Sequence, residues 1–373
     1  MIRDIQSYRQ HARQTYEGQK VSDNPDEAQR SAFTRPAPGT EVYSPRLATK
    51  KLDAHSFAID RDDFVEQHNK QAEQYIFVQA PAAWAHRHIY AYVDAYAVRT
   101  LVVYIADRIK QPIQLHTLFG QSTTADQYDS CIVILADDAQ ATFIDRYHAT
   151  DGTHVRSIVY HVGARAQLTV VYDHASQQQA LMASGHLFRC ARDSNVTVQC
   201  VLGSGIRTDV WFDIFLTETG AQATVRGVYA FGGRGRLNMV TEQQHNAPHT
   251  TSEITLNGCL SGHAQATYHG RIHIDHAAQH AVAQQRNHTL LLADTARAVS
   301  IPSLEALAHE VHCVHASAVG TVDKQAIAYL VARGIPFEHA RMLIVQGFMH
   351  TSMGACSYLE SAVRKSLQVL TTG

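Results

Sequence analysis

The chain has 373 residues, 45% of them hydrophobic and 18% charged, so it can bury a sizeable core and dominant disorder is excluded. Its 32 Lys and Arg nearly balance its 34 Asp and Glu, which excludes the strongly basic surface of a nucleic-acid or anionic-membrane binder. No apolar run approaches the ~20 residues of a membrane span, and the first residues lack the apolar core of a secretion signal. We therefore expect a cytoplasmic protein without nucleic-acid or membrane partners.

Residues 1–71 are polar and form an N-terminal arm in this interpretation. Ile2, Ile5 and Tyr8 recur at helical spacing and predict a short helix near the start of the arm. Several prolines follow this segment and break any longer helical pattern. The arm is thus expected to flank the core and not to form it.

Residues 72–321 consist of short β-rich runs, such as TLVVYI, CIVIL, LTVVY and EITL, separated by Gly, Asp, Asn and Ser. One fragment, A-Q-A-T followed by a large apolar residue, begins at Ala139, Ala221 and Ala264, with a looser copy at Ala164. On a strand each copy places its two alanines and the large residue on one face. Small inward residues on stacked short strands favour a β-solenoid, and the uneven spacing of the copies predicts insertions between coils. A β-sandwich is the alternative.

Residues 322–373 are predicted to form three helices at the end of the β core. Asp323 is a suitable N-cap for the first helix, which ends at Gly334. Pro336 opens the second, which is expected to end at Gly347. The apolar faces expected to be buried are Ile327, Leu330 and Val331 in the first helix and Leu359, Val363, Leu367 and Leu370 in the third.

Several common catalytic motifs are missing from the sequence. There is no G-x-x-x-x-G-K-[ST] phosphate loop, so the chain is expected to bind no nucleotide and to hydrolyse no ATP by itself. In His309-Glu310-Val311-His312 the second His comes one residue too early for the H-E-x-x-H zinc motif. No G-x-S-x-G nucleophile elbow occurs. These absences disfavour an ATPase, a metalloprotease and an α/β-hydrolase.

Cys313 and His315 are the candidate ligands. If their segment is a strand, positions 309, 311, 313 and 315 share one face, with the thiol and the imidazole ~7 Å apart along the backbone. Thiolate and imidazole suit iron, zinc and iron–sulfur centres, but two ligands do not complete a site, so a partner would supply the rest. The alternative is that Cys313 is a small buried hydrophobic residue and that His315 belongs to a His-rich surface.

The other cysteines show no C-x-x-C pair and are interpreted as single thiols. Cys131 and Cys200 lie within apolar runs and are expected in the core, whereas Cys259 fits either core or rim. Cys190 and Cys356 have no neighbour that suggests a role.

The text around Cys313 resembles that of a known family. Residues 302–305, 308–316 and 319–323 resemble the pattern P-x-L-E-I-x-A-D-D-V-x-C-S-H-G-A-T-V-G of the SufB/SufD family of iron–sulfur cluster assembly proteins, and the C-x-H text favours its SufD branch. His309, Ala316 and Ala318 stand where the pattern has Asp, Gly and Thr. Further matches over about residues 205–350 are Gly270-Arg271-Ile272 and Gln285-Arg286-Asn287 upstream, and Arg333-Gly334-Ile335 downstream.

This resemblance implies a right-handed parallel β-helix between terminal helical parts, acting as a non-enzymatic scaffold subunit. It implies pairing with a SufB-like β-helical subunit through the last coils, around residues 285–320. It also implies docking of a SufC-like ABC-type ATPase on the helices after Asp323, and a homodimer as the alternative when the chain is alone. His315, with Cys313 as helper, would contact a nascent iron–sulfur cluster or iron at the SufB interface.

Two other functional classes remain open at this point. One is a β-helical polysaccharide-active enzyme, with Asp209, Asp213 and Arg226 on one face of the coil. The other is a purely structural binding coil.

Overall fold

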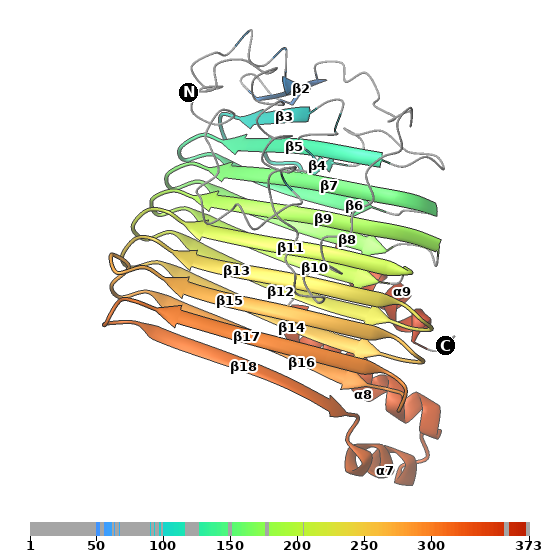
Figure 1. Cartoon of the computed structure of the whole chain (residues 1–373). Coiled ribbons are helices and arrows are strands. Elements are labelled where there is room, and N and C mark those ends of the chain that lie inside the picture. The colour runs from blue at the N-terminus through green and yellow to red at the C-terminus, as the bar shows by residue number, and fades with distance from the viewer. Residues whose placement is uncertain are drawn as a thin grey trace, which may run out of the picture.

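The structure, a computed structural model, describes residues 100–115, 127–147, 151–175, 179–203, 205–353 and 358–370, with shorter pieces between residues 50 and 97. The predicted helix at the start of the arm and Cys356 lie outside the described residues. Two sheets face one another, and from β3 onward successive strands of the chain alternate between them (Figure 1). Apart from two antiparallel strands at one edge, all pairs are parallel, so the chain coils as a parallel β-solenoid. The predicted solenoid is confirmed, and the β-sandwich alternative is wrong.

The first sheet, sheet A, has ten strands and the second, sheet B, has eight. In order, sheet A contains β1 (Lys50–Lys51), β2 (Phe57–Asp60), β3 (Thr100–Ile105), β5 (Gln127–Leu135), β7 (Asp151–Val162), β9 (Gln179–Cys190), β11 (Arg207–Leu216), β13 (Arg236–His245), β15 (Gln265–Ile274) and β17 (Arg297–Ala306). Sheet B contains β4 (Ile113–Gln114), β6 (Gln140–Tyr147), β8 (Gln167–Ala175), β10 (Asn195–Gly203), β12 (Gln222–Phe231), β14 (Thr251–Leu260), β16 (Val282–Leu291) and β18 (His312–Thr321).

The strand register corrects the spacing of the sequence repeat. Gln140 pairs with Gln167, so the second copy of the repeat begins at Ala166 and not at Ala164. The copy at Ala264 directly precedes β15 of sheet A, whereas the copies at Ala139 and Ala221 precede strands of sheet B. The distance from Ala221 to Ala264 therefore includes an extra half turn of the coil. Positions paired in parallel lie 26 to 32 residues apart in the turns that the structure describes. The predicted insertions are therefore wrong, and the coil is nearly regular.

The core lies between the two sheets and follows from the alternation of side chains. In β6, Ala141 and Phe143 are buried inside the coil, whereas Gln140 and Thr142 are partly exposed outside it. The corners need left-handed backbone, and several are formed by Asp or His, which tolerate it better than branched residues. Asp138 and His280, for example, have φ of 62° and 61°.

Three helices follow the last strand: α7 (Lys324–Ala332), α8 (Phe337–Met353) and α9 (Glu360–Val369). Asp323 caps α7 by accepting a hydrogen bond from the Gln325 N–H, and Gly334 follows the helix with φ of 88°, as predicted. The stripe of α9 is buried as predicted, but Val331 of α7 is 42% exposed.

The second helix continues past Gly347 to Met353, which corrects the predicted end. Its residues Val345, Met349 and Met353 are buried in one cluster with apolar residues on the outer face of sheet B. This packing outweighs the ~1 kcal/mol that a glycine costs inside a helix. No helix in the described part of the chain is long and apolar enough to cross a membrane.

Candidate functional site

Cys313 and His315 lie on β18, the last strand of sheet B. They pair with Ala283 and Gln285 of β16, which are buried inside the coil, so both side chains face the interior at the end of the solenoid. The predicted shared face is thus correct for these two residues. It is wrong for positions 309 and 311, because β18 begins only at His312 and both precede it in the connection.

Both groups are partly buried, and this burial favours the neutral form of each. Burial lowers the pKa of His315, which favours the neutral imidazole, and burial raises the pKa of the Cys313 thiol. Neither ring nitrogen of His315 has a hydrogen-bond partner among the described residues. Cys313 packs beside the cluster of Ile272, Ala283 and Ala308. A neutral imidazole without a partner can ligate a metal, whereas the protonated thiol is the weaker ligand.

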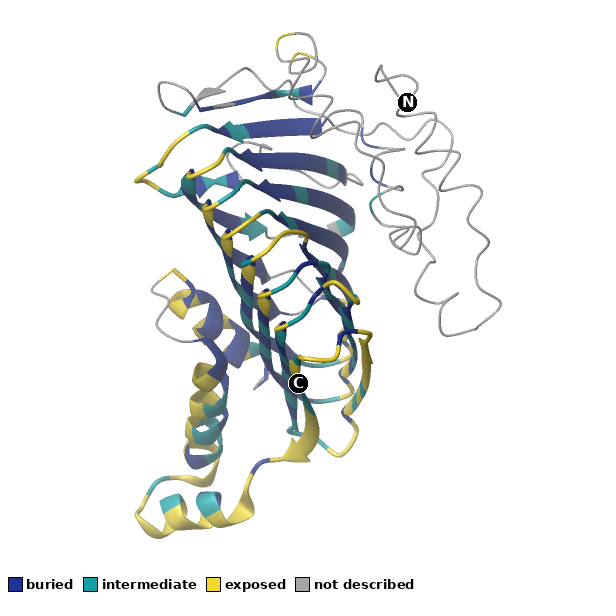
Figure 2. Ribbon diagram, turned by 90° about the vertical axis from the view of Figure 1, so that its left-hand side faces the viewer, coloured by how far each residue is buried: buried dark blue, intermediate teal, exposed yellow. Residues whose placement is uncertain are grey.

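This end of the solenoid is open. The outer edges of β17 and β18 pair with no other described strand. Positions that the preceding turn buries are exposed here: Leu304, which pairs with the buried Ile272, is 48% exposed, and Val319, which pairs with the buried Thr289, is 44% exposed. Figure 2 shows the contrast between these exposed last strands and the buried strands before them. Unpaired edges with exposed apolar residues are typical of a surface that another chain covers.

The remaining described cysteines belong to the core. Cys131 and Cys200 are buried inside the coil, as predicted, and Cys190 is buried with them. Cys259 is buried beneath the C-terminal helices, so of the two predicted alternatives it belongs to the core and not to the rim. Burial raises the pKa of Cys190 and of Cys200 to about 12, so neither forms a thiolate at neutral pH. Within the described ranges, no group of three or more His, Cys, Asp or Glu residues could hold a metal ion.

The residues proposed for a polysaccharide-active site do not share a face. Asp209 and Asp213 lie on β11 in sheet A, and Arg226 lies on β12 in the opposite sheet. Both carboxylates are buried and engaged: Asp209 accepts a hydrogen bond from the Asn238 amide at 2.6 Å, and Asp213 accepts one from the Tyr90 hydroxyl at 2.8 Å. The grouping predicted from the sequence is therefore wrong.

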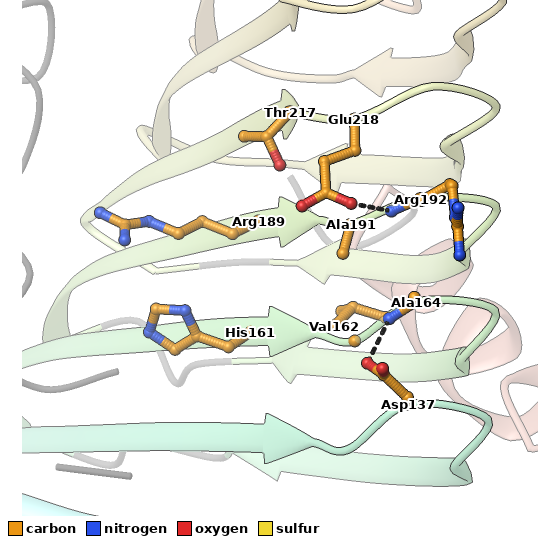
Figure 3. Close-up of a pocket in the computed structure, with 10 residues that line it drawn as sticks. Asp137, His161, Val162, Ala164, Arg189, Ala191, Arg192, Thr217 and Glu218 are labelled. Carbon is orange, nitrogen blue, oxygen red and sulfur yellow. Dashed lines mark hydrogen bonds between the residues drawn. The ribbon is translucent and has the colours of Figure 1, made fainter. Parts of the chain in front are cut away.

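A groove of about 510 Å³ lies at the corner of the middle turns. His161 of β7 and Arg189 of β9 occupy paired positions and lie one above the other on its wall (Figure 3). Its two carboxylates form hydrogen bonds to the backbone at the corners of the coil. Asp137 accepts a hydrogen bond from the Ala164 N–H at 2.8 Å, and Glu218 accepts one from the Arg192 N–H at 2.9 Å. They tie successive turns together.

A buried ion pair that the sequence patterns did not predict lies inside the coil. One guanidinium nitrogen of Arg156 donates to both oxygens of Asp145 at 3.0 Å, and both residues are buried. The His174 ring lies 3.5 Å from Asp145, and the Arg156 guanidinium lies over the Tyr147 ring at 4.4 Å. Burial alone would raise the pKa of Asp145, but Arg156 and His174 hold it well below its usual range. The available signal was a charged residue on the alternating apolar face of each strand: Asp145 lies two positions after Phe143 in β6, and Arg156 lies two positions before Ile158 in β7.

The fold and the open end define a parallel β-solenoid protein whose last described turn leaves two strand edges unpaired. Residues 118–348 match the family model described as "SUF system FeS cluster assembly, SufBD core domain". The chain therefore belongs to the SufBD family of iron–sulfur cluster assembly proteins.

Curated relatives agree with this assignment. An iron–sulfur cluster assembly SufBD family protein of Mycobacterium bovis is 28% identical over 258 residues, which cover 67% of this chain and 64% of the relative. The iron–sulfur cluster assembly protein SufD of Bacillus subtilis is 25% identical over 247 residues, covering 65% of this chain and 56% of that protein. A family member of Staphylococcus saprophyticus is 24% identical over 78% of this chain and 63% of its own length. The matches thus span less than two thirds of these relatives.

Proposed function

We propose that this chain is a non-catalytic scaffold subunit for iron–sulfur cluster assembly in the cytoplasm. It pairs with a SufB-like subunit through β17 and β18 and docks a SufC-like ABC-type ATPase through its C-terminal helices. The open end of the solenoid carries this proposal, because two unpaired parallel edges can be continued by a second β-solenoid. A second copy of the chain is the alternative occupant when no partner is available.

The nascent cluster is the cargo of this scaffold. His315 offers a neutral imidazole at the open end, and Cys313 lies on the same face of β18. The partner supplies the remaining ligands, because two side chains leave an iron ion incompletely coordinated. ATP binding and hydrolysis belong to the docked ATPase, since the sequence contains no phosphate loop.

Substituting His315→Ala is expected to lower cluster yield at least about tenfold while the complex keeps its composition, because an imidazole ligand is lost. Cys313→Ser should give a smaller loss, since its thiol is protonated. The measurement is cluster reconstitution on the purified complex, followed by absorbance and iron content. His312→Ala is the matched control, because His312 is exposed on the same strand. A normal cluster yield from the double variant His315→Ala/Cys313→Ser would show that neither residue takes part in cluster assembly. If His315→Ala instead weakens the complex as much as it lowers the cluster yield, His315 only packs at the interface.

Exposed apolar residues of the C-terminal helices support ATPase docking there. Tyr329 of α7 is 58% exposed, Phe337 of α8 is 55% exposed and Leu343 is 50% exposed. Deleting the helices is not a clean test, because Met349, Val363 and their neighbours cover the outer face of sheet B. Point substitutions on the exposed face avoid that damage.

The double variant Tyr329→Ser/Phe337→Ser is expected to weaken ATPase binding at least about tenfold, because large aromatic anchors contribute most to interfaces. Its melting temperature should stay that of the wild type, since both rings are largely exposed. Calorimetric titration with the purified ATPase measures the affinity. Tyr358→Ser is the control, as Tyr358 is 42% exposed but precedes α9. Unchanged affinity in the double variant would place the ATPase elsewhere.

A further inference from the structure

Gln285 joins the two sheets directly beneath the open end. It lies on β16, is fully buried, and its Nε2 donates to the Thr241 hydroxyl of β13 at 2.8 Å. That hydroxyl also forms a hydrogen bond with the Tyr268 hydroxyl at 2.8 Å. The amide is therefore anchored from across the interior of the coil, and its orientation is set by a second layer of hydrogen bonds.

Gly270 provides the space that the amide occupies. A Cβ atom at position 270 would overlap the Nε2, Oε1 and Cδ atoms of the Gln285 side chain. Gly270 pairs with Thr241, so the glycine and the hydroxyl flank the amide from the same sheet. The G-R-I and Q-x-N motifs of the sequence thus meet inside the coil, where the glycine of the first leaves space for the glutamine of the second.

The other end of this amide has no partner. Among the described residues, none bonds to the Gln285 Oε1 atom or to either ring nitrogen of His315, and all three atoms are buried. Gln285 and His315 pair in register on adjacent strands, ~4.8 Å apart, with their side chains on the same side. An unfilled acceptor and an unfilled donor therefore lie at paired positions of adjacent strands, and leaving buried polar groups unpaired is costly.

We propose that Gln285 is a positioning residue for His315. Its Oε1 accepts one ring N–H, which fixes the tautomer and leaves the lone pair of the other ring nitrogen free to ligate iron. Metal-ligating histidines commonly donate their second ring N–H to such an acceptor. The use of that lone pair rests on the proposed function, whereas the hydrogen bond itself does not.

The test is the tautomer ratio of His315 in the full chain, labelled with nitrogen-15 in its histidines, at pH 8 where imidazole is neutral. The signals are assigned by their loss in His315→Ala. Gln285→Met lacks the acceptor oxygen. It should therefore reduce the ratio of the tautomer that donates to Gln285 over the other tautomer about three- to tenfold, the effect of one hydrogen bond. Gln285→Glu keeps an acceptor oxygen and should keep the wild-type tautomer, and Gly270→Ala should act like Gln285→Met by displacing the amide.

Ser300→Ala is the matched control, because the Ser300 hydroxyl at the same end of the coil also lacks a partner among described residues. It should leave the ratio unchanged. An unchanged ratio in Gln285→Met, or an equal change in Ser300→Ala, would overturn the proposal. If Gln285→Met fails to fold, as judged by its melting curve, Gly270→Ala and Gln285→Glu decide in its place. Cluster yield is measured separately, so a changed ratio with normal yield in His315→Ala would keep the hydrogen bond and reject the function.

Discussion

Substituting Arg156→Met is expected to lower the free energy of unfolding by about 3–5 kcal/mol, because it leaves the buried Asp145 carboxylate without its main partner. The His174 ring at 3.5 Å compensates only in part, since it must become protonated to pair with the carboxylate. Chemical unfolding followed by circular dichroism measures the change. The double variant Arg156→Met/Asp145→Asn should recover part of the loss, because it removes the uncompensated charge.

The loss should also depend on pH in a defined direction. In the wild type the pKa of Asp145 is held low, so its stabilising contribution is present above the unfolded value near 3.8 and is lost as pH falls. Without Arg156, burial raises this pKa, and the variant becomes less stable as pH rises through it. The difference between variant and wild type should therefore be larger at pH 7.5 than at pH 5.

A matched surface pair separates burial from charge. Arg165 and Asp138 form an ion pair at 2.6 Å, with side chains 46% and 63% exposed. Arg165→Met should lower the free energy of unfolding far less than Arg156→Met, because solvent screens such a pair. Equal losses in Arg156→Met and Arg165→Met would show that the buried pair contributes no more than an exposed one.

Much of the fold follows from short-range sequence patterns. The alternation in segments such as β10 and β14 identifies strands, and the helix caps at Asp323 and Gly334 depend on neighbouring residues only. The repeat was misaligned at Ala164 because two alanines, Ala164 and Ala166, fit the pattern, and only the pairing of Gln167 with Gln140 separates them. The end of α8 was missed because its last turn is stabilised by sheet B, which lies far away in the sequence.

The site shows the same division. Cys313 and His315 could be grouped from the alternation within one strand. Gln285 and Gly270 could not be linked to His315, because their contacts depend on the register between turns and across the interior. Arg226 was wrongly grouped with Asp209 and Asp213, since strand order along the chain does not reveal which sheet a strand joins.

Substituting Val319→Lys is expected to weaken pairing with the SufB-like subunit at least about 30-fold, or ~2 kcal/mol. Val319 is 44% exposed on β18, so in the free chain the lysine ammonium reaches water and stability should hardly change. Once a second solenoid covers this end, the ammonium becomes buried without a partner, which is costly. Val311 is a poorer choice, because it packs against the interior cluster at Ala308 and a lysine there would also disturb the fold.

The affinity is measured by titrating the purified SufB-like subunit, and the free energy of unfolding by denaturation of the chain alone. Ile206→Lys is the matched control, because Ile206 is 53% exposed but precedes β11 in the middle of the solenoid. It should leave pairing unchanged. If Val319→Lys lowers the unfolding free energy as much as the pairing free energy, Val319 belongs to the core of the free chain. If pairing keeps its wild-type affinity, the partner does not cover β18, and the edges of the last turn have another occupant.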